Sequence, residues 1–119
     1  MQDFHKLKVW EKSHQLTLDI YRVTIEFPKE ELYGLINQIR KSSASIATNI
    51  AEGCGRETNA ELKRFLYIAM GSASETEYHL LLSKELGYLT ESDFARLNQE
   101  IGSVKQMITS LIKKLKTDN

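Results

Sequence analysis

The stretch from Leu32 to Glu52, LYGLINQIRKSSASIATNIAE, indicates the fold of this chain. Its large apolar residues recur at alternating steps of four and three positions, and one small residue continues the same series. The series is Leu32, Ile36, Ile39, Ser43, Ile46 and Ile50. Such spacing places every member on one face of an α-helix, as in the seam of a helical bundle. We therefore expect a helix from Leu32 to Glu52 that is buried along one face.

Three further segments show helical periodicity. The first runs from Phe4 to Glu26 and ends before Pro28, because proline lacks an amide donor and disfavours helix in the residue before it. The third opens at Thr58-Asn59-Ala60-Glu61, a capping box in which the hydroxyl and the carboxylate satisfy free backbone amides, and continues to Leu86. The fourth starts from the weaker cap Thr90-Glu91-Ser92-Asp93 and continues to Leu115.

Glycines mark two of the expected helix ends. Gly53 and Gly87 follow the second and third periodic segments, and glycine adopts positive φ without Cβ strain. Four amphipathic helices with short connections, and no competing strand pattern, predict an all-α fold. We expect an antiparallel up-and-down four-helix bundle that forms a single domain over residues 1–119.

Composition excludes several classes of protein. The chain is 41% hydrophobic and 27% charged, as in ordinary globular proteins. No apolar run approaches the roughly 20 residues that a membrane helix needs, and no apolar segment follows the charged N-terminus, so a cytoplasmic location is expected. The lone Cys54 excludes an intrachain disulfide and any site built from several cysteines.

The sequence lacks the patterns of common catalytic sites. A di-iron bundle needs Glu-x-x-His on two helices, and the nearest approach here is Glu75 with His79, one turn apart. Gly53 and Gly55 flank Cys54 without the remaining residues of a phosphate-binding loop. Cys54 has no base beside it on the second or third helix. We therefore expect no enzyme activity, no cofactor and no metal.

Five short motifs together resemble one family. They are Tyr33-Gly34-Leu35, Gln38-Ile39-Arg40, the run Ser45–Gly53, the run Ala69–Glu75 and Leu86-Gly87-Tyr88-Leu89. The chain is similar to the four helix bundle proteins first noticed in intervening sequences of bacterial 23S rRNA genes, and the resemblance covers almost its whole length. Many relatives carry a kinking proline where this chain has Ala47.

The resemblance implies a fold and an assembly rather than an activity, since most of the family has no established biochemistry. The fold is similar to the accessory protein of diversity-generating retroelements, a ring of five bundles that engages RNA and a reverse transcriptase. That relative is strongly basic, whereas this chain balances 16 basic with 16 acidic residues.

Small residues in the family motifs predict a close helix crossing. They lie on the second helix between Ser42 and Ala51 and on the third between Ala69 and Ser74. Structural roles are accordingly expected for the motif residues Arg40, Asn49, Glu52, Gly53, Gly71, Ser72 and Glu75. Arg40 and Glu75 each sit one position from a seam, and we expect them to meet as a partly buried ion pair between these helices.

Apolar residues outside the seams predict self-association. They are Trp10, Tyr21, Tyr67, Tyr78 and Leu82. Exposed aromatic side chains usually mark an interface. The sequence therefore favours a non-enzymatic, self-associating scaffold or adaptor with an unknown partner, and the resemblance favours a pentamer.

Charge is polarised along the expected bundle, which leaves an alternative function open. One end gathers basic residues, namely Lys6, Lys8, Lys12, Arg56, Lys63, Arg64, Lys113, Lys114 and Lys116. Such an end could bind RNA as part of an accessory module, or its lysines could simply complement the dipole of the fourth helix and keep the surface hydrated.

Overall fold

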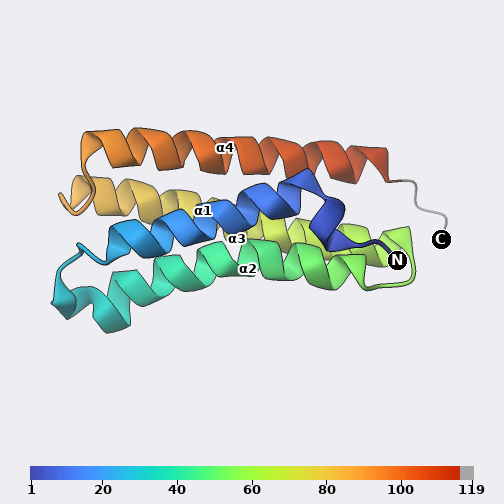
Figure 1. Cartoon of the computed structure of the whole chain (residues 1–119), viewed down its shortest axis with the longest axis horizontal. Coiled ribbons are helices and arrows are strands. Elements are labelled where there is room, and N and C mark those ends of the chain that lie inside the picture. The colour runs from blue at the N-terminus through green and yellow to red at the C-terminus, as the bar shows by residue number, and fades with distance from the viewer. Residues whose placement is uncertain (116–119) are drawn as a thin grey trace.

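The computed structural model describes residues 1–115 of the chain. Within that range four α-helices pack together, α1 (Lys8–Thr24), α2 (Asn37–Cys54), α3 (Asn59–Glu85) and α4 (Glu91–Lys114). Each helix runs antiparallel to the one before it (Figure 1). Helix α2 packs on α1 and α3, and α4 packs on α3 and α1. The predicted all-α, antiparallel up-and-down four-helix bundle is therefore confirmed.

The core consists of the residues whose spacing predicted the helices. Ile39, Ile46 and Ile50 of α2 are fully buried. The other helices add Ile20, Leu66, Leu80, Leu97, Ile101, Val104 and Ile108. Leu32 is the exception, with 48% of its surface exposed, because the non-helical Gly34 separates it from the regular turns of α2.

The first helix is interrupted near its start. A 3-10 turn, η1 (Phe4–Lys6), comes first, and Leu7 is extended between this turn and α1. The turn has its own cap, because the Asp3 carboxylate accepts a hydrogen bond from the His5 amide at 3.1 Å. The break lets Phe4 fold back against Trp10, with ring centroids 4.8 Å apart. The single helix expected from Phe4 to Glu26 is therefore interrupted at its start, and α1 ends at Thr24, two residues earlier than expected.

Two irregular turns connect α1 to α2. A 3-10 turn, η2 (Lys29–Glu31), leads into a π turn, η3 (Leu32–Ile36), in which Gly34 has non-helical φ −111° and ψ −112°. The Glu31 carboxylate accepts hydrogen bonds from the Leu35 amide and the Tyr88 hydroxyl, both at 3.1 Å. It thereby ties this connection to the one between α3 and α4. The helix expected from Leu32 begins at Asn37 and runs without interruption through Ala47.

Gly53 packs against the neighbouring helix instead of ending its own. Helix α2 continues to Cys54, and the following Gly55 has an ordinary φ of −81°. A Cβ on Gly53 would lie 2.9 Å from both Leu62 Cδ1 and Phe65 Cβ on α3. The expected C-terminal stop at Gly53 is therefore wrong, because this position needs glycine for close helix approach. Gly87 does have the positive φ expected of a helix stop, at 81°.

The threonine hydroxyls of both predicted N-terminal caps bond as expected. The Thr58 hydroxyl accepts a hydrogen bond from the Glu61 amide at 3.1 Å, and α3 begins at the next residue, Asn59. The Thr90 hydroxyl accepts one from the Asp93 amide at 3.0 Å, and α4 begins at Glu91. These bonds satisfy amides that the first helical turn leaves without a partner.

Small and polar side chains fill the contact between α2 and α3, as expected from the motifs, but Gly71 and Ser74 of the predicted set are exposed instead. Ala69 and Ala73 are fully buried. The hydroxyls of Ser42 and Thr76 lie 2.9 Å apart, and Ser42 Oγ is 3.3 Å from His79 Nδ1. This buried cluster joins the two helices and fixes their register, because its polar groups have no access to water.

Arg40 joins α2 to α1, so the expected ion pair with Glu75 is wrong. Arg40 Nε donates to Thr24 Oγ1 at 2.9 Å, and Nη2 donates to the Tyr21 carbonyl at 3.2 Å. Glu75 is exposed on α3 and approaches only His79, at 3.8 Å. The reason is rotational: Ser42 faces α3, and Arg40, two positions earlier, points to the opposite flank of α2.

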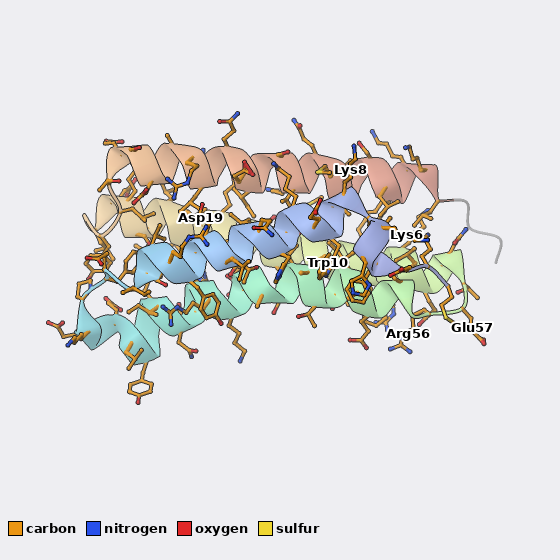
Figure 2. All side chains as sticks on the ribbon, viewed as in Figure 1. Lys6, Lys8, Trp10, Asp19, Arg56 and Glu57 are labelled. Atoms are coloured by element: carbon orange, nitrogen blue, oxygen red, sulfur yellow. The ribbon has the colours of Figure 1, made fainter. Side chains whose placement is uncertain are left out.

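Ion pairs on the surface connect α1 to α4. The Arg96 guanidinium binds both carboxylate oxygens of Asp19, each at 3.0 Å. Lys12 Nζ lies 2.7 Å from Glu100 Oε2. Asp19 projects from α1 toward α4 in Figure 2. Helix α1 is thus held to α2 by Arg40 and to α4 by these pairs.

We expect Gly53→Ala to destabilise the protein by roughly 1–3 kcal/mol, because its Cβ would overlap Leu62 and Phe65. Gly102→Ala in α4 is the matched control, since a Cβ there meets nothing within 4 Å and alanine favours helix. Urea unfolding followed by circular dichroism measures both changes. Equal stability of the two variants would contradict the packing role of Gly53.

A double-mutant cycle tests the revised partner of Arg40. Arg40→Met and Thr24→Val should each cost about 1–3 kcal/mol, since the bond between them involves a charged donor and a buried hydroxyl. The double variant should lose less than the sum of the two. Arg40→Met combined with Glu75→Gln serves as control and should be additive. Coupling in the control pair, or none in the test pair, would overturn this assignment.

Candidate interaction surfaces

A groove runs along the outside of the bundle where α1 meets α2. Its first part has a volume of about 560 Å³, with larger side chains on the η1 and α1 side and small ones on the α2 side. The lining residues are Phe4, Trp10, His14, Thr17, Leu18 and Tyr21, facing Ala44, Ala47, Thr48 and Ala51. Trp10, which is labelled in Figure 2, stacks on His14 with ring centroids 5.2 Å apart.

A second hollow of about 450 Å³ continues the first, because Tyr21, Ala44 and Thr48 line both. It is more polar and contains the cations Arg40 and Lys41. The Arg40 guanidinium carbon lies 4.6 Å from the centroid of the Tyr21 ring. The two hollows together are called the α1–α2 groove below.

Helix α3 carries a row of exposed residues on its outer side. Tyr67, Tyr78 and Leu81 are 61%, 58% and 42% exposed. Gly71 and Ser74, which lie between the tyrosines, are also exposed. These five residues follow steps of four, three, four and three, which is the spacing of a packing seam. They are called the α3 seam below, and nothing within residues 1–115 covers it.

Gly71 has no packing role within the chain. A Cβ at this position would meet nothing within 4 Å, in contrast to Gly53. Glycine in the middle of a helix costs roughly 1 kcal/mol relative to alanine. The monomeric fold therefore gives no reason for a glycine here.

Four of the five predicted interface residues lie on these two surfaces. Trp10 and Tyr21 line the groove, and Tyr67 and Tyr78 belong to the seam. Leu82 is half-buried and lies on neither surface, so its place in an interface stays a prediction. The sequence analysis missed Leu81, although it continues the spacing of the two tyrosines. It also missed Leu18, whose place beside α2 depends on how α1 packs.

The predicted basic end is only partly available to a partner. Lys12, Arg56 and Arg64 form ion pairs with Glu100, Glu52 and Glu61. Five lysines of this end have no ion-pair partner within residues 1–115, namely Lys6, Lys8, Lys63, Lys113 and Lys114. Figure 2 places Lys6, Lys8 and Arg56 toward the same end of the bundle. Lys116 lies outside the described residues.

The remaining motif residues make short-range contacts. Asn49 Nδ2 donates to the Ser45 carbonyl one turn earlier, at 2.8 Å. Glu52 pairs with Arg56 at 3.0 Å, and the Ser72 carbonyl accepts from the Thr76 hydroxyl at 2.9 Å. Glu75, with 59% of its side chain exposed, borders the α3 seam. The partners of Asn49, Glu52 and Ser72 thus lie one turn away in the chain, and none of these three contacts joins two helices.

Two titratable side chains noted in the sequence, His79 and Cys54, are buried. Burial lowers the pKa of His79, and the nearby Glu75 carboxylate only partly opposes this, so His79 is neutral at pH 7. Burial raises the pKa of the Cys54 thiol, and Cys54 is only 1% exposed. Among residues 1–115 no group of three or more His, Cys, Asp or Glu side chains could hold a metal ion.

None of the helices in the described part of the chain is both long and apolar enough to cross a membrane.

A crystal structure of a protein of unknown function from Bacteroides thetaiotaomicron resembles this chain closely. That protein is assigned to the S23 ribosomal protein family and is 28% identical to this chain. The match covers 89% of this chain and 99% of that one, with a TM-score of 0.80. No curated protein matches the chain.

The model of the family described as 23S rRNA-intervening sequence protein matches residues 5–110. This range contains all the motifs on which the sequence resemblance rested and all of α1, α2 and α3. The chain therefore belongs to the 23S rRNA-intervening sequence protein family.

Proposed function

We propose that this protein is a non-enzymatic, self-associating scaffold or adaptor. The observation that carries this proposal is that one chain leaves aromatic and aliphatic side chains uncovered on two surfaces, the first part of the α1–α2 groove and the α3 seam. Large exposed apolar patches are rare on monomeric proteins and usually mark interfaces. Tyrosine and tryptophan are also the side chains most enriched in such interfaces.

The apolar character of α3 supports the same function. Its inner side buries Leu66, Ala73 and Leu80, and its outer side exposes tyrosines and Leu81. A helix that is apolar on both sides is normally buried on both sides. In the proposed assembly, a neighbouring copy covers the outer side of α3. A ring of five is the favoured assembly, since it is the one that the family resemblance implies.

The purified protein at micromolar concentration should have a mass several times the 13.7 kDa of one chain. Burial of the two apolar surfaces drives this association. Size-exclusion chromatography with light scattering measures the mass, and five copies are expected. Dilution over two orders of magnitude distinguishes a weak from a stable assembly. A monomer at every concentration would refute the proposed function.

An RNA-binding accessory module is the second candidate. Its support is the set of five lysines at the basic end that have no ion-pair partner in the described range, two of which close α4. Lysines held by no carboxylate are available to phosphates, and binding would release the counterions of the RNA. The balanced overall charge gives no general attraction to RNA, so binding would have to use this end.

Replacing Lys113, Lys114 and Lys116 with Gln should weaken RNA binding and flatten its dependence on salt, because fewer counterions are released. Gln in place of Arg22 and Lys29, at the other end of the bundle, is the control. Filter binding of a structured RNA at several salt concentrations measures both. No binding by the natural protein, or equal loss in both variants, would exclude an RNA site at the basic end.

A further inference from the structure

The two uncovered surfaces match each other when two copies stand side by side. We propose that the α3 seam of one copy lies in the α1–α2 groove of the next, so that copies assemble head to tail through two different surfaces. This inference rests on the proposed self-association and specifies its geometry. Three observations carry it, namely the register of the helices, the sizes of the facing side chains and their charges.

The register follows from contacts within one chain. Ser42 lies opposite Thr76 and His79, and Gly53 lies opposite Leu62 and Phe65. Antiparallel helices rise equally per residue, so Ala47 stands level with about Gly71 and Ala51 with about Tyr67. In the proposed assembly, neighbouring copies are related by rotation about an axis parallel to the bundle, so these levels are kept between neighbours.

The α1 side of the groove follows the same levels. Tyr21 stands beside Arg40, and Thr17 bonds to the Ser43 carbonyl at 3.1 Å. Trp10 therefore stands level with about Ala51, and Leu18 with about Ser74 on α3. The residues that line the groove thus stand at the same heights along the bundle axis as the residues of the α3 seam.

Large side chains face small ones at these levels. Tyr67 reaches the part of the groove where Ala51 leaves space beside Trp10. The exposed Leu18 faces the gap that Gly71 and Ser74 leave between the two tyrosines. This explains why α3 has a glycine with empty space above it, since a side chain at Gly71 would fill the gap.

Polar groups match at the remaining level. Tyr78 stands level with Arg40, whose guanidinium has Tyr21 on one face and can accept a second ring on the other. Lys41 lies in the groove and forms no ion pair within residues 1–115. Glu75, at nearly the same level, has only the neutral His79 beside it. Lys41 of one copy thus faces the Glu75 carboxylate of its neighbour, and the two opposite charges can pair.

A head-to-tail contact has a signature that a symmetric contact lacks. Thr48→Arg blocks the groove and leaves the seam intact, whereas Gly71→Arg blocks the seam and leaves the groove intact. Both positions are exposed, and a Cβ on Gly71 meets nothing, so both variants should fold. Gly102→Arg on α4 is the matched control because its Cβ also meets nothing.

We expect each blocked variant to be a monomer and the control to keep the natural mass in light scattering. An equimolar mixture of the two blocked variants should give a complex of two chains, because one intact groove meets one intact seam and neither end can extend. Helical circular dichroism and the melting temperature of each variant verify folding.

Other outcomes separate this inference from the function on which it rests. A monomeric natural protein would refute self-association altogether. Blocked variants that still assemble, or that stay monomeric when mixed, would overturn the head-to-tail contact while self-association stands.

Charge reversal provides a second test that does not depend on bulky substitutions. Lys41→Glu and Glu75→Lys should each weaken assembly several-fold, and the double variant should regain it, since the pair is restored with its signs exchanged. Failure of the double variant to recover would overturn the proposed register.

Discussion

The close approach of α2 and α3 is the constraint on which the rest of the structure depends. Gly53 brings the helices together beside the turn that joins them, and the buried hydroxyls of Ser42 and Thr76 hold them at the far side. Between these points the contact is made by small side chains such as Ala69 and Ala73. A long contact with steric limits at one end and hydrogen bonds at the other allows one register only.

This register also determines what α2 can offer to the outside. Because its larger seam residues face the core, the flank toward α1 is left with Ala44, Ala47 and Ala51. Aromatic side chains of η1 and α1 therefore project beyond the small side chains of α2 and form one wall of the groove. The groove is therefore a consequence of the packing inside the bundle, because the same motif that brings α2 onto α3 leaves only small side chains on the flank of α2 toward α1.

Sequence patterns predicted the helices, their buried faces, both threonine caps and the stop at Gly87, because each depends on residues close together in the chain. The break at Leu7 and the π turn at Gly34 depend on local hydrogen bonds made by the Asp3 and Glu31 carboxylates. Hydrophobic periodicity contains no information about such bonds. Gly53 and Arg40 were misassigned for a further reason. Their roles depend on how α2 is rotated about its own axis. A residue one position away from the seam can face either neighbouring helix, so its place in the sequence does not determine its partner. The exposed tyrosines could be predicted, but their positions relative to residues of α2 follow only from the register of the two helices in the structure.

The α2–α3 and α1–α4 edges of the bundle are held by different kinds of contact, and this difference determines where the bundle begins to unfold. The α2–α3 edge is held by buried contacts, whereas the α1–α4 edge is bridged by the surface pairs of Arg96 with Asp19 and Lys12 with Glu100. Dissolved ions weaken surface pairs and leave buried packing almost untouched. Partial unfolding therefore starts where the first and last helices meet, and the α2–α3 hairpin keeps its amide protons longest during hydrogen exchange.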